Sequence, residues 1–540
     1  MNSTQDAPQT TSEDEIRKID PLFFGKRDGA FPDARTLRSD SEKYSKLYHT
    51  VENWEGLRRW KNEKELKDIE DHYYGRDTER RYLWLDELDR HMKLSGKISG
   101  PQVDDNDNEE AINDKKAYAH GSLASFLEKA RQHISNRYPG TNILEAFDAI
   151  FIGLMFGRHV YVEGSSGIGK TQIVRELCSM LSLPYQQYDA YADATDLSLL
   201  GGEVPVSLND SIAFSFERGP LLTPGLLGLV IDELPRLPAS TSNVLLQAMA
   251  ERKVSVSLVA SGRGAATVLL SPHFIVIGTG NPVGYGGQGE RSFALFDRFD
   301  IGIEMKHPGL QARRQILVGQ AASGSRNEFT SKPNFTLSVI NALVREVCMP
   351  SIFFPILITA AYALGPKEFL RRTETENPGW LTSDSIGRFG KSSDEADQME
   401  RVMWEAARVF TTKHKDDARR LAEMVEENLT EGSNPRGEIS VVNNAKALAL
   451  VRHPSKATWT VPQVYLDDLG QAFHWANYAR LKTYPGAEGQ RGALLDAATA
   501  LFFDSRKWIS IVEALQSSSS DIRGKVTDEL RKFSKNPAND

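Results

Sequence analysis

The chain has 540 residues, of which 40% are hydrophobic, and a formal net charge of -8. This length allows two to four domains with sizeable cores. The negative charge argues against a protein whose main activity is non-specific binding of nucleic acid. Cys178 and Cys348 are the two cysteines, which excludes a disulfide framework and a cysteine-rich zinc site.

The first 115 residues are polar and rich in charged side chains, and they end in the acidic run "DDNDNEE". This composition predicts charged helices with disordered flanks. The start of the chain has neither a basic region nor an apolar core typical of a signal peptide. Aromatic residues in this part could dock a partner or pack among the helices themselves: Trp54, Trp60, Tyr73, Tyr74 and Trp84.

From about residue 120 to 305, apolar runs of strand length alternate with helical patterns. This alternation predicts an α/β layer structure with a parallel sheet, and the chain after 305 is predicted to be mainly helical. The longest apolar stretches, 149–157 and 352–364, are too short to span a bilayer. We therefore expect a soluble cytoplasmic protein that does not associate with membranes.

The segment "GSSGIGKT" lies between a predicted strand at 159–163 and a predicted helix. In this context glycines allow the backbone to wrap around phosphate oxygens at a helix N-terminus. Lys170 would contact the phosphates and the Thr171 hydroxyl would bind Mg²⁺. The alternative is a glycine-rich turn with a solvated lysine. The predicted nucleotide-binding residues are Gly164, Ser165, Ser166, Gly167, Ile168, Gly169, Lys170, Thr171 and Gln172.

A second apolar run, "LLGLVI", ends in Asp232 and Glu233. Buried parallel strands present catalytic side chains at such ends. We expect Asp232 to bind the metal and Glu233 to activate the attacking water. The alternative is a solvated strand end.

A third apolar run ends in Asn281, and the segment "FALFDRFDI" follows it. Asn281 could orient the attacking water or sense the γ-phosphate, or it could only cap a turn. Arg298 could act in catalysis or pair with a nearby carboxylate such as Asp297. The chain contains no N-K-x-D tetrapeptide, so adenine is favoured over guanine as the base.

The stretch from 164 to 301 resembles the AAA+ ATPase module of the MoxR branch. The similarity includes "FSFERGPLLTPGLLGLVIDELPRLPASTSNVLLQAMAERKVSV" and "GTGNPVGYGGQGERSFALFDRF", and a later stretch, "GSNPRGEISVVNNAKALAL", resembles the family's sensor 2 helix. The resemblance implies a P-loop α/β core with a parallel sheet, followed by an all-α lid. It also implies ATP and Mg²⁺ as ligands.

The same resemblance assigns roles to two arginines and suggests partners. Arg298 would project toward the nucleotide of a neighbouring subunit, and Arg436 would be the sensor arginine of the lid. A ring of six subunits is implied. The resemblance also implies a partner with a von Willebrand factor A domain. The D-x-S-x-S signature of such a domain is absent from this chain, so the partner would be a separate protein.

These observations predict four segments: a charged, mainly helical extension over 1–118, an α/β domain over 119–305, a helical lid over 306–482 with an insertion near 365–430, and a helical extension over 483–540. The N-terminal extension and the insertion in the lid could bind partners or have no role in binding. Two hairpins, before the second and third apolar runs, are expected to face the pore of a ring.

The function expected from the residues and the resemblance is an ATP-driven motor that remodels partner proteins. A nucleic-acid motor, helicase-like or a restriction component, is the alternative, with nucleic acid as a partner the less favoured case. A scaffold that binds ATP but seldom hydrolyses it is a third reading, and the presence of Glu233 and Arg298 argues against it.

Overall fold

The structure is a computed structural model that describes residues 109–534, apart from 209–210, 224–225, 259–263, 272, 283–291, 323–328, 336, 366–394, 453–460 and 517–518. The predicted N-terminal aromatic helices and much of the predicted lid insertion lie outside the described residues. The described chain forms two compact units. Among the described residues, the first contains 182–278, and the second contains 109–181 together with 279–534.

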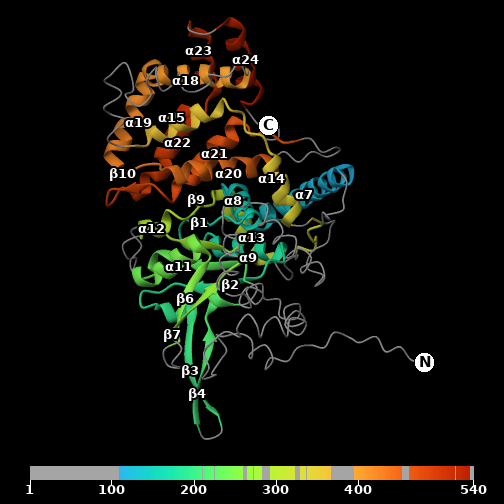
Figure 1. Ribbon diagram of the computed structural model, residues 1–540, viewed down its shortest axis with the longest axis vertical. Helices are drawn as coiled ribbons and strands as arrows, with labels where there is room; N and C mark the ends of the chain where they lie inside the picture. Colours follow the sequence, from blue (N-terminus) through green and yellow to red (C-terminus); the bar gives the residue numbers. More distant parts are fainter. Residues whose placement is uncertain are drawn as a thin grey trace, which may run out of the picture. The chain divides into compact units, whose positions relative to one another are not determined.

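The first unit contains three strands of a parallel sheet and two antiparallel hairpins. β5 is hydrogen-bonded to β2 on one side and to β8 on the other, and both pairs are parallel. The predicted hairpins are confirmed: β3 pairs with β4, and β6 pairs with β7. Figure 1 shows that β3 and β4 form a long arm. The tips of both hairpins, including Arg263, lie outside the described residues.

The elements of the first unit are β2 (Tyr185–Asp189), α10 (Asp196–Leu200), β3 (Gly201–Leu208), β4 (Ser211–Arg218), η2 (Pro220–Leu222), β5 (Gly228–Asp232), η3 (Leu234–Arg236), α11 (Ala239–Glu251), β6 (Lys253–Leu258), β7 (Gly264–Leu269) and β8 (Ile275–Gly280). The last two residues of β8 belong to the second unit.

The strand order of the sheet is β2-β5-β8-β1-β9. β1 (Val160–Glu163) and β9 (Ile301–Glu304) pair in parallel, with Val160 opposite Ile301. β1, β5 and β8 are almost completely buried, as expected for parallel strands covered on both faces. The predicted α/β core with a parallel sheet is therefore confirmed.

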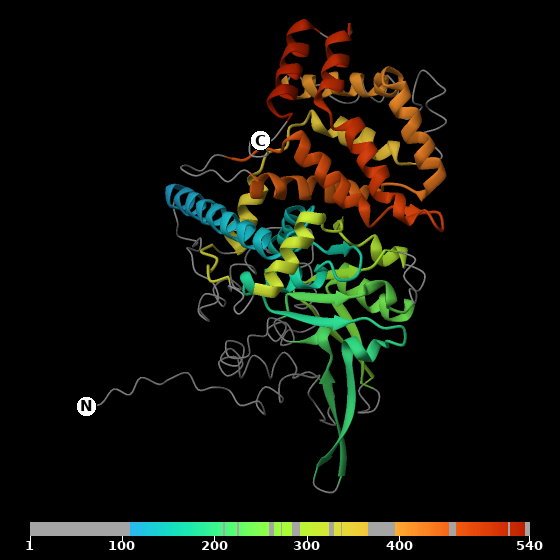
Figure 2. The ribbon, with the colours of Figure 1, turned by 180° about the vertical axis from the view of Figure 1, so that it is seen from behind.

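The second unit is mainly helical outside β1 and β9, which confirms the predicted helical region after 305. Figure 2 shows the C-terminal helices of this unit from behind. Its elements are α7 (Glu109–Arg137), α8 (Ile143–Phe156), α9 (Lys170–Met180), α12 (Phe293–Phe296), α13 (Leu310–Ala322), α14 (Leu337–Glu346), α15 (Phe353–Ala363), α18 (Glu395–Lys413), α19 (Lys415–Asn428), β10 (Leu429–Glu431), α20 (Pro435–Arg452), α21 (Leu466–Tyr478), β11 (Lys482–Thr483), η4 (Glu488–Gln490), α22 (Arg491–Phe502), α23 (Ser505–Ala514) and α24 (Ser520–Lys532).

Helices α8, α20 and α21 form the apolar centre of the second unit. α8 is buried along almost its whole length, and it packs against α7, α9, β9 and α20. β9 approaches α21 so closely that a Cβ atom on Gly302 would lie 2.7 Å from the backbone nitrogen of Ala479. This contact joins the strand layer of the unit to its lid helices.

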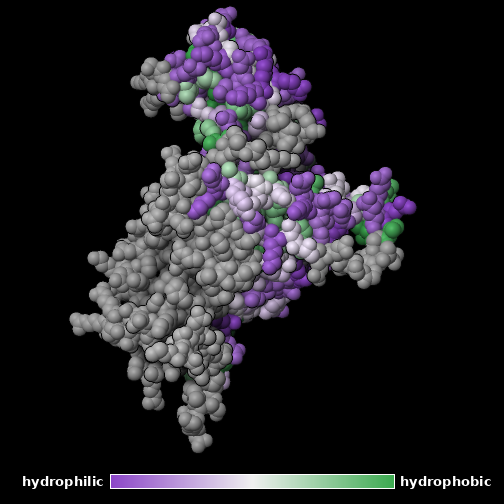
Figure 3. Space-filling view, turned by 90° about the vertical axis from the view of Figure 1, so that its right-hand side faces the viewer, coloured by the Kyte–Doolittle hydropathy of each residue, from purple (hydrophilic) through white to green (hydrophobic). Residues whose placement is uncertain are grey.

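The exposed surface of the last helices is polar. Figure 3 shows hydrophilic side chains over much of the visible face of the C-terminal helices. Among the described residues, no helix has the length and apolar character needed to span a membrane.

Candidate functional site

The loop between β1 and α9 adopts a conformation that depends on glycine. Gly167 and Gly169 have φ angles of 80° and 93°, which residues with a side chain rarely adopt. A Cβ atom on Gly164 would lie 2.7 Å from the carbonyl oxygen of Met305. The loop thus exposes its backbone at the N-terminus of α9, where the helix dipole favours an anion.

Lys170, the first residue of α9, folds back over this loop. Its side chain is buried, and its Nζ donates to the carbonyl oxygens of Gly164 and Ser165 at 2.6 and 2.9 Å. Nζ also donates to Oδ1 of Asn281 at 3.0 Å. The structure therefore brings together Lys170 and Asn281, two residues predicted from separate motifs.

The end of β8 positions Asn281 beside Lys170. The amide of Gly164 donates to the carbonyl of Gly280 at 3.1 Å, which joins the start of the loop to the end of β8. Asn281 itself is buried. The Asn281 amide is therefore held beside the lysine of the loop.

Asp232 and Glu233 lie at the end of β5 in the first unit. Glu233 has φ 55° and ψ 40°, a left-handed conformation that is uncommon for a residue other than glycine. Its backbone amide donates to Oδ1 of Asp232 at 3.2 Å, and Oε2 lies 3.6 Å from Nε of Arg236. Backbone strain of this kind is concentrated at functional positions.

The predicted sensor arginine lies at the start of a lid helix. α20 begins with Pro435, a residue favoured at the first helical position, and Arg436 follows it. Arg436 donates to Oδ2 of Asp297, and Asn434 Nδ2 donates to Oδ1 of the same carboxylate at 2.8 Å. Asp297 immediately precedes Arg298, so the structure links the segments of both predicted arginines.

Arg480, which no sequence motif indicated, holds the turn that contains Asp297 and Arg298. Its side chain is 1% exposed; Nε donates to the carbonyl oxygen of Asp297 at 3.1 Å, and Nη2 donates to Ser440 Oγ at 3.1 Å. Nη2 is also 3.6 Å from Oδ1 of Asp300. Arg480 therefore holds the residues on both sides of Arg298.

Asp300 is the second carboxylate of this anchor. It accepts hydrogen bonds from Ser440 Oγ at 2.9 Å and from the His159 amide at 3.1 Å. Burial alone would raise the pKa of Asp300, but the charges of Arg158, His159 and Arg480 and the Ser440 hydroxyl together lower it. The carboxylate is thus stabilised in its ionised form.

Glu163, directly before the loop, forms another buried contact with the lid helices. Its Oε2 accepts from Tyr478 Oη and from Arg491 Nη2, both at 3.0 Å. Burial, and then the nearby Glu163 carboxylate, raise the pKa of Tyr478 well above its usual range, so the phenol remains a donor. The base of the loop is therefore tied to α21 and α22.

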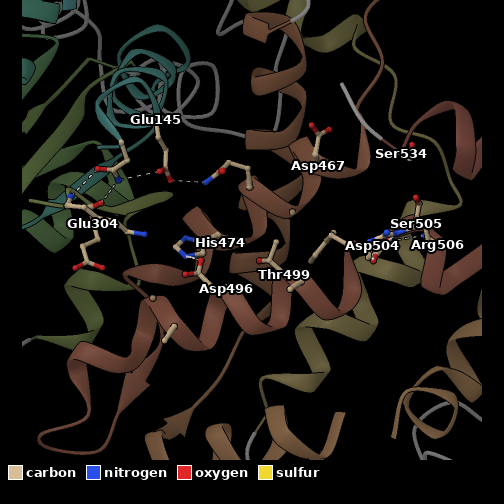
Figure 4. Close-up of a pocket in the computed structure, with 18 residues that line it drawn as sticks. Glu145, Glu304, Asp467, His474, Asp496, Thr499, Asp504, Ser505, Arg506 and Ser534 are labelled. Atoms are coloured by element: carbon tan, nitrogen blue, oxygen red, sulfur yellow. Dashed lines mark hydrogen bonds and ion pairs between the residues drawn. The ribbon is translucent and has the colours of Figure 1, made fainter. Parts of the chain in front are cut away.

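A cavity of about 930 Å³ lies in the second unit, away from the glycine loop. Figure 4 shows that its labelled side chains include Glu145, Glu304, His474 and Asp496. His474 Nε2 lies 3.3 Å from Oδ1 of Asp496, and the Glu145 carboxylate accepts from Gln471 and Trp475. No residue of the predicted nucleotide site lines this cavity, so the candidate site is the loop at α9.

Comparisons with known proteins agree with the geometry of the loop. A family model described as "ATPase family associated with various cellular activities (AAA)" matches residues 159–301. The chain is 27% identical over 170 residues to "Chaperone MoxR1" of Mycobacterium tuberculosis, covering 32% of this chain and 42% of that protein.

Residues 159–301 thus match an AAA ATPase module, and the similarity to MoxR1 agrees with the resemblance to the MoxR branch. A second relative, "Uncharacterized protein YeaC" of Bacillus subtilis, is 27% identical over 201 residues, covering 37% of this chain and 58% of the relative. The chain therefore spans about half the length of these two curated relatives.

Two further similar proteins align over larger shares of this chain and of their own length. "Holliday junction branch migration complex subunit RuvB" of Bifidobacterium adolescentis is 26% identical over 250 residues, covering 44% of this chain and 64% of that protein. The solved structure of a putative ATPase from Cytophaga hutchinsonii aligns with a TM-score of 0.49 and 16% identity, covering 72% of this chain and 96% of that chain.

Proposed function

We propose that the AAA+ module binds and hydrolyses ATP with the residues predicted from its motifs. The observation that carries this proposal is the position of Lys170, a buried ammonium held by loop carbonyls and by Asn281 at the N-terminus of α9. Phosphate oxygens compete well for such a group, because hydrogen bonds between ions are stronger than those to neutral carbonyls.

The loop suits a phosphate chain, since Gly167 and Gly169 adopt left-handed conformations and have no neighbouring atom closer than 3.8 Å to an added Cβ atom. Thr171 and Asp232 would hold Mg²⁺, which supplies positive charge against the phosphates. Glu233 would accept the proton of the attacking water, and Asn281 would orient that water. Within the first unit, Ile231 of β5 pairs with Gly278 of β8, and Asp232 is the last residue of β5.

The assembly proposed for this module is a homo-oligomeric ring, with six subunits as in the family it resembles. Arg298 would act on the nucleotide of the neighbouring subunit, and Arg436 on the nucleotide of its own. Asp297, the carboxylate that precedes Arg298, is contacted by Asn434 and Arg436.

The proposed activity of the ring is to remodel a separate client protein. A partner protein with a von Willebrand factor A domain would take part in this remodelling. The name of the relative MoxR1 includes the word chaperone. The relatives named RuvB favour a second candidate, a nucleic-acid motor. Duplex DNA that stimulates ATP hydrolysis in a strongly salt-dependent manner would support this second candidate.

Glu233→Gln tests the chemistry directly. The amide cannot accept a proton, so we expect ATP binding to persist while turnover falls by about 100-fold or more. Glu251→Gln is the matched control, because it makes the same change at an exposed residue at the end of α11. Normal turnover by Glu233→Gln, measured as phosphate release, would assign the base to another residue.

Mixing variants tests the action of Arg298 between subunits. Arg298→Ala keeps a complete pocket, and Glu233→Gln keeps the arginine, so each alone is expected to be inactive. Rings formed from both contain interfaces where an intact pocket meets an intact arginine, and part of the activity should return. Mixed rings verified by differential tags that recover no hydrolysis would contradict this arrangement.

A further inference from the structure

Asp297 lies between the two arginines of the proposed mechanism. It is the residue before Arg298 in the chain, and its carboxylate binds Arg436, the proposed sensor of the γ-phosphate. The Nη1 group that donates to this carboxylate cannot at the same time donate fully to a phosphate, and the carboxylate holds the guanidinium in place. The same guanidinium therefore has two competing anionic partners, one in the protein and one in the substrate.

The two lid arginines at Asp297 differ in how easily they can leave it. The Arg436 side chain is 47% exposed, whereas that of Arg480 is 1% exposed and also contacts Ser440 and Asp300. Arg436 can move with little repacking, because a partly exposed ion pair contributes little free energy. Arg480 would keep the turn attached to α21 after Arg436 has moved.

We propose that Asp297 is a positioning residue that competes with the γ-phosphate of ATP for Arg436. This inference rests on the proposed function. In the structure Arg436 is bound to Asp297. When ATP binds, the guanidinium transfers to the γ-phosphate, a stronger hydrogen-bond acceptor with more negative charge.

This exchange has a consequence for the neighbouring subunit. Transfer of Arg436 leaves the Asp297 carboxylate with Asn434 and Arg480 as its partners, directly beside Arg298. The electrostatic surroundings of Arg298 therefore depend on whether its own subunit holds ATP. ADP, which lacks the γ-phosphate, would leave Arg436 on Asp297.

The test is the affinity of Asp297→Asn for ATP and for ADP, measured with fluorescent nucleotides in the full-length Glu233→Gln background. The amide keeps an oxygen for Asn434 but removes the charge that holds Arg436. We expect ATP affinity to rise about threefold to fivefold, the gain that follows from releasing a partly exposed ion pair. ADP affinity should change by less than about twofold.

Three controls separate competition from a structural effect. Asp297→Glu keeps the charge and should bind ATP as the parent does. Asp300→Asn alters the other carboxylate that contacts Arg480 and should give no ATP-specific gain. In an Arg436→Ala background, Asp297→Asn should have no effect, because the residue for which it competes is gone.

An unchanged ATP affinity, an equal gain for ADP, or a gain that persists without Arg436 would overturn the inference. If Asp297→Asn unfolds, Asp297→Ser provides the same comparison with a smaller neutral side chain. Failure of the Glu233→Gln parent to bind ATP would reject the proposed function itself, so the two failures are distinguishable.

Discussion

The glycine loop and the lid anchor are both needed for the proposed mechanism, but they are built in different ways. The loop from Gly164 to Thr171 is one continuous segment, and it depends on backbone conformation and on one lysine. The lid anchor is the set of contacts that Asp297 and Asp300 make with Asn434, Arg436, Ser440 and Arg480. It depends on side chains that are up to 183 residues apart in sequence.

This difference predicts different consequences of mutation. A change in the loop should remove ligand binding and leave the fold intact, because the Lys170 ammonium donates to the loop itself and to Asn281, and these hydrogen bonds do not involve the lid helices. A change in the lid anchor should lower the stability of the second unit first, because it leaves buried ionic groups without partners.

Lys170→Ala should have the largest effect on function. It removes the ammonium that faces the phosphates, and we expect ATP affinity to fall by about 1000-fold, a loss typical of a desolvated charge partner. The measurement is ATP binding by calorimetry, together with the unfolding temperature. Lys129→Ala, which makes the same change at an exposed residue of α7 outside the loop, should bind almost normally. Unchanged binding by Lys170→Ala would refute the phosphate-binding role of the loop.

Arg480→Met should show the opposite pattern. The substitution keeps much of the volume of a side chain that is 1% exposed, but it leaves Asp297 and Asp300 without their shared cation. We expect the free energy of unfolding to fall by about 3 to 5 kcal/mol, as for other broken buried pairs.

The matched control for this change is Arg419→Met in α19. Arg419 pairs with Glu423 one turn away, but its side chain is 74% exposed, so the loss should be about 0.5 kcal/mol or less. Denaturant unfolding of the full-length chain compares the two. Similar losses at both positions would mean that the lid anchor contributes no more than a surface ion pair.

Lowering the pH should weaken the packing of α7 against α20 before it affects the glycine loop. His120 of α7 is buried against α20, and desolvation lowers its pKa to about 4. The unfolded chain binds this proton near pH 6.5, so the stability that neutral His120 contributes is complete above that pH and is lost as pH falls toward 4. The loss is about 3 kcal/mol at most.

His120→Leu should flatten the pH dependence of the unfolding free energy between pH 6.5 and 4. His307→Leu, at an exposed histidine, should leave it unchanged. The same pH dependence in wild type and His120→Leu would show that another group titrates in this window.

Sequence patterns were sufficient for features that depend on neighbouring residues. The glycine-rich loop, the apolar runs of β5 and β8 and the alternation in both hairpins each correspond to an element of the structure. These patterns are readable because local backbone conformation and burial on both faces of a strand constrain consecutive side chains. The class of the core and the position of its glycine-rich loop follow from such patterns.

Only the tertiary structure could place Arg480, Tyr478 and Arg491. In the sequence they stand in "YARLKTYPGAEGQR", a segment without a recognisable motif. Folding brings Arg480 to Asp297 and brings Tyr478 and Arg491 to Glu163, because β9 and α21 pack in direct contact at Gly302. The partner of a buried charge is chosen by which segments meet in space, and the order of residues along the chain does not encode that choice locally.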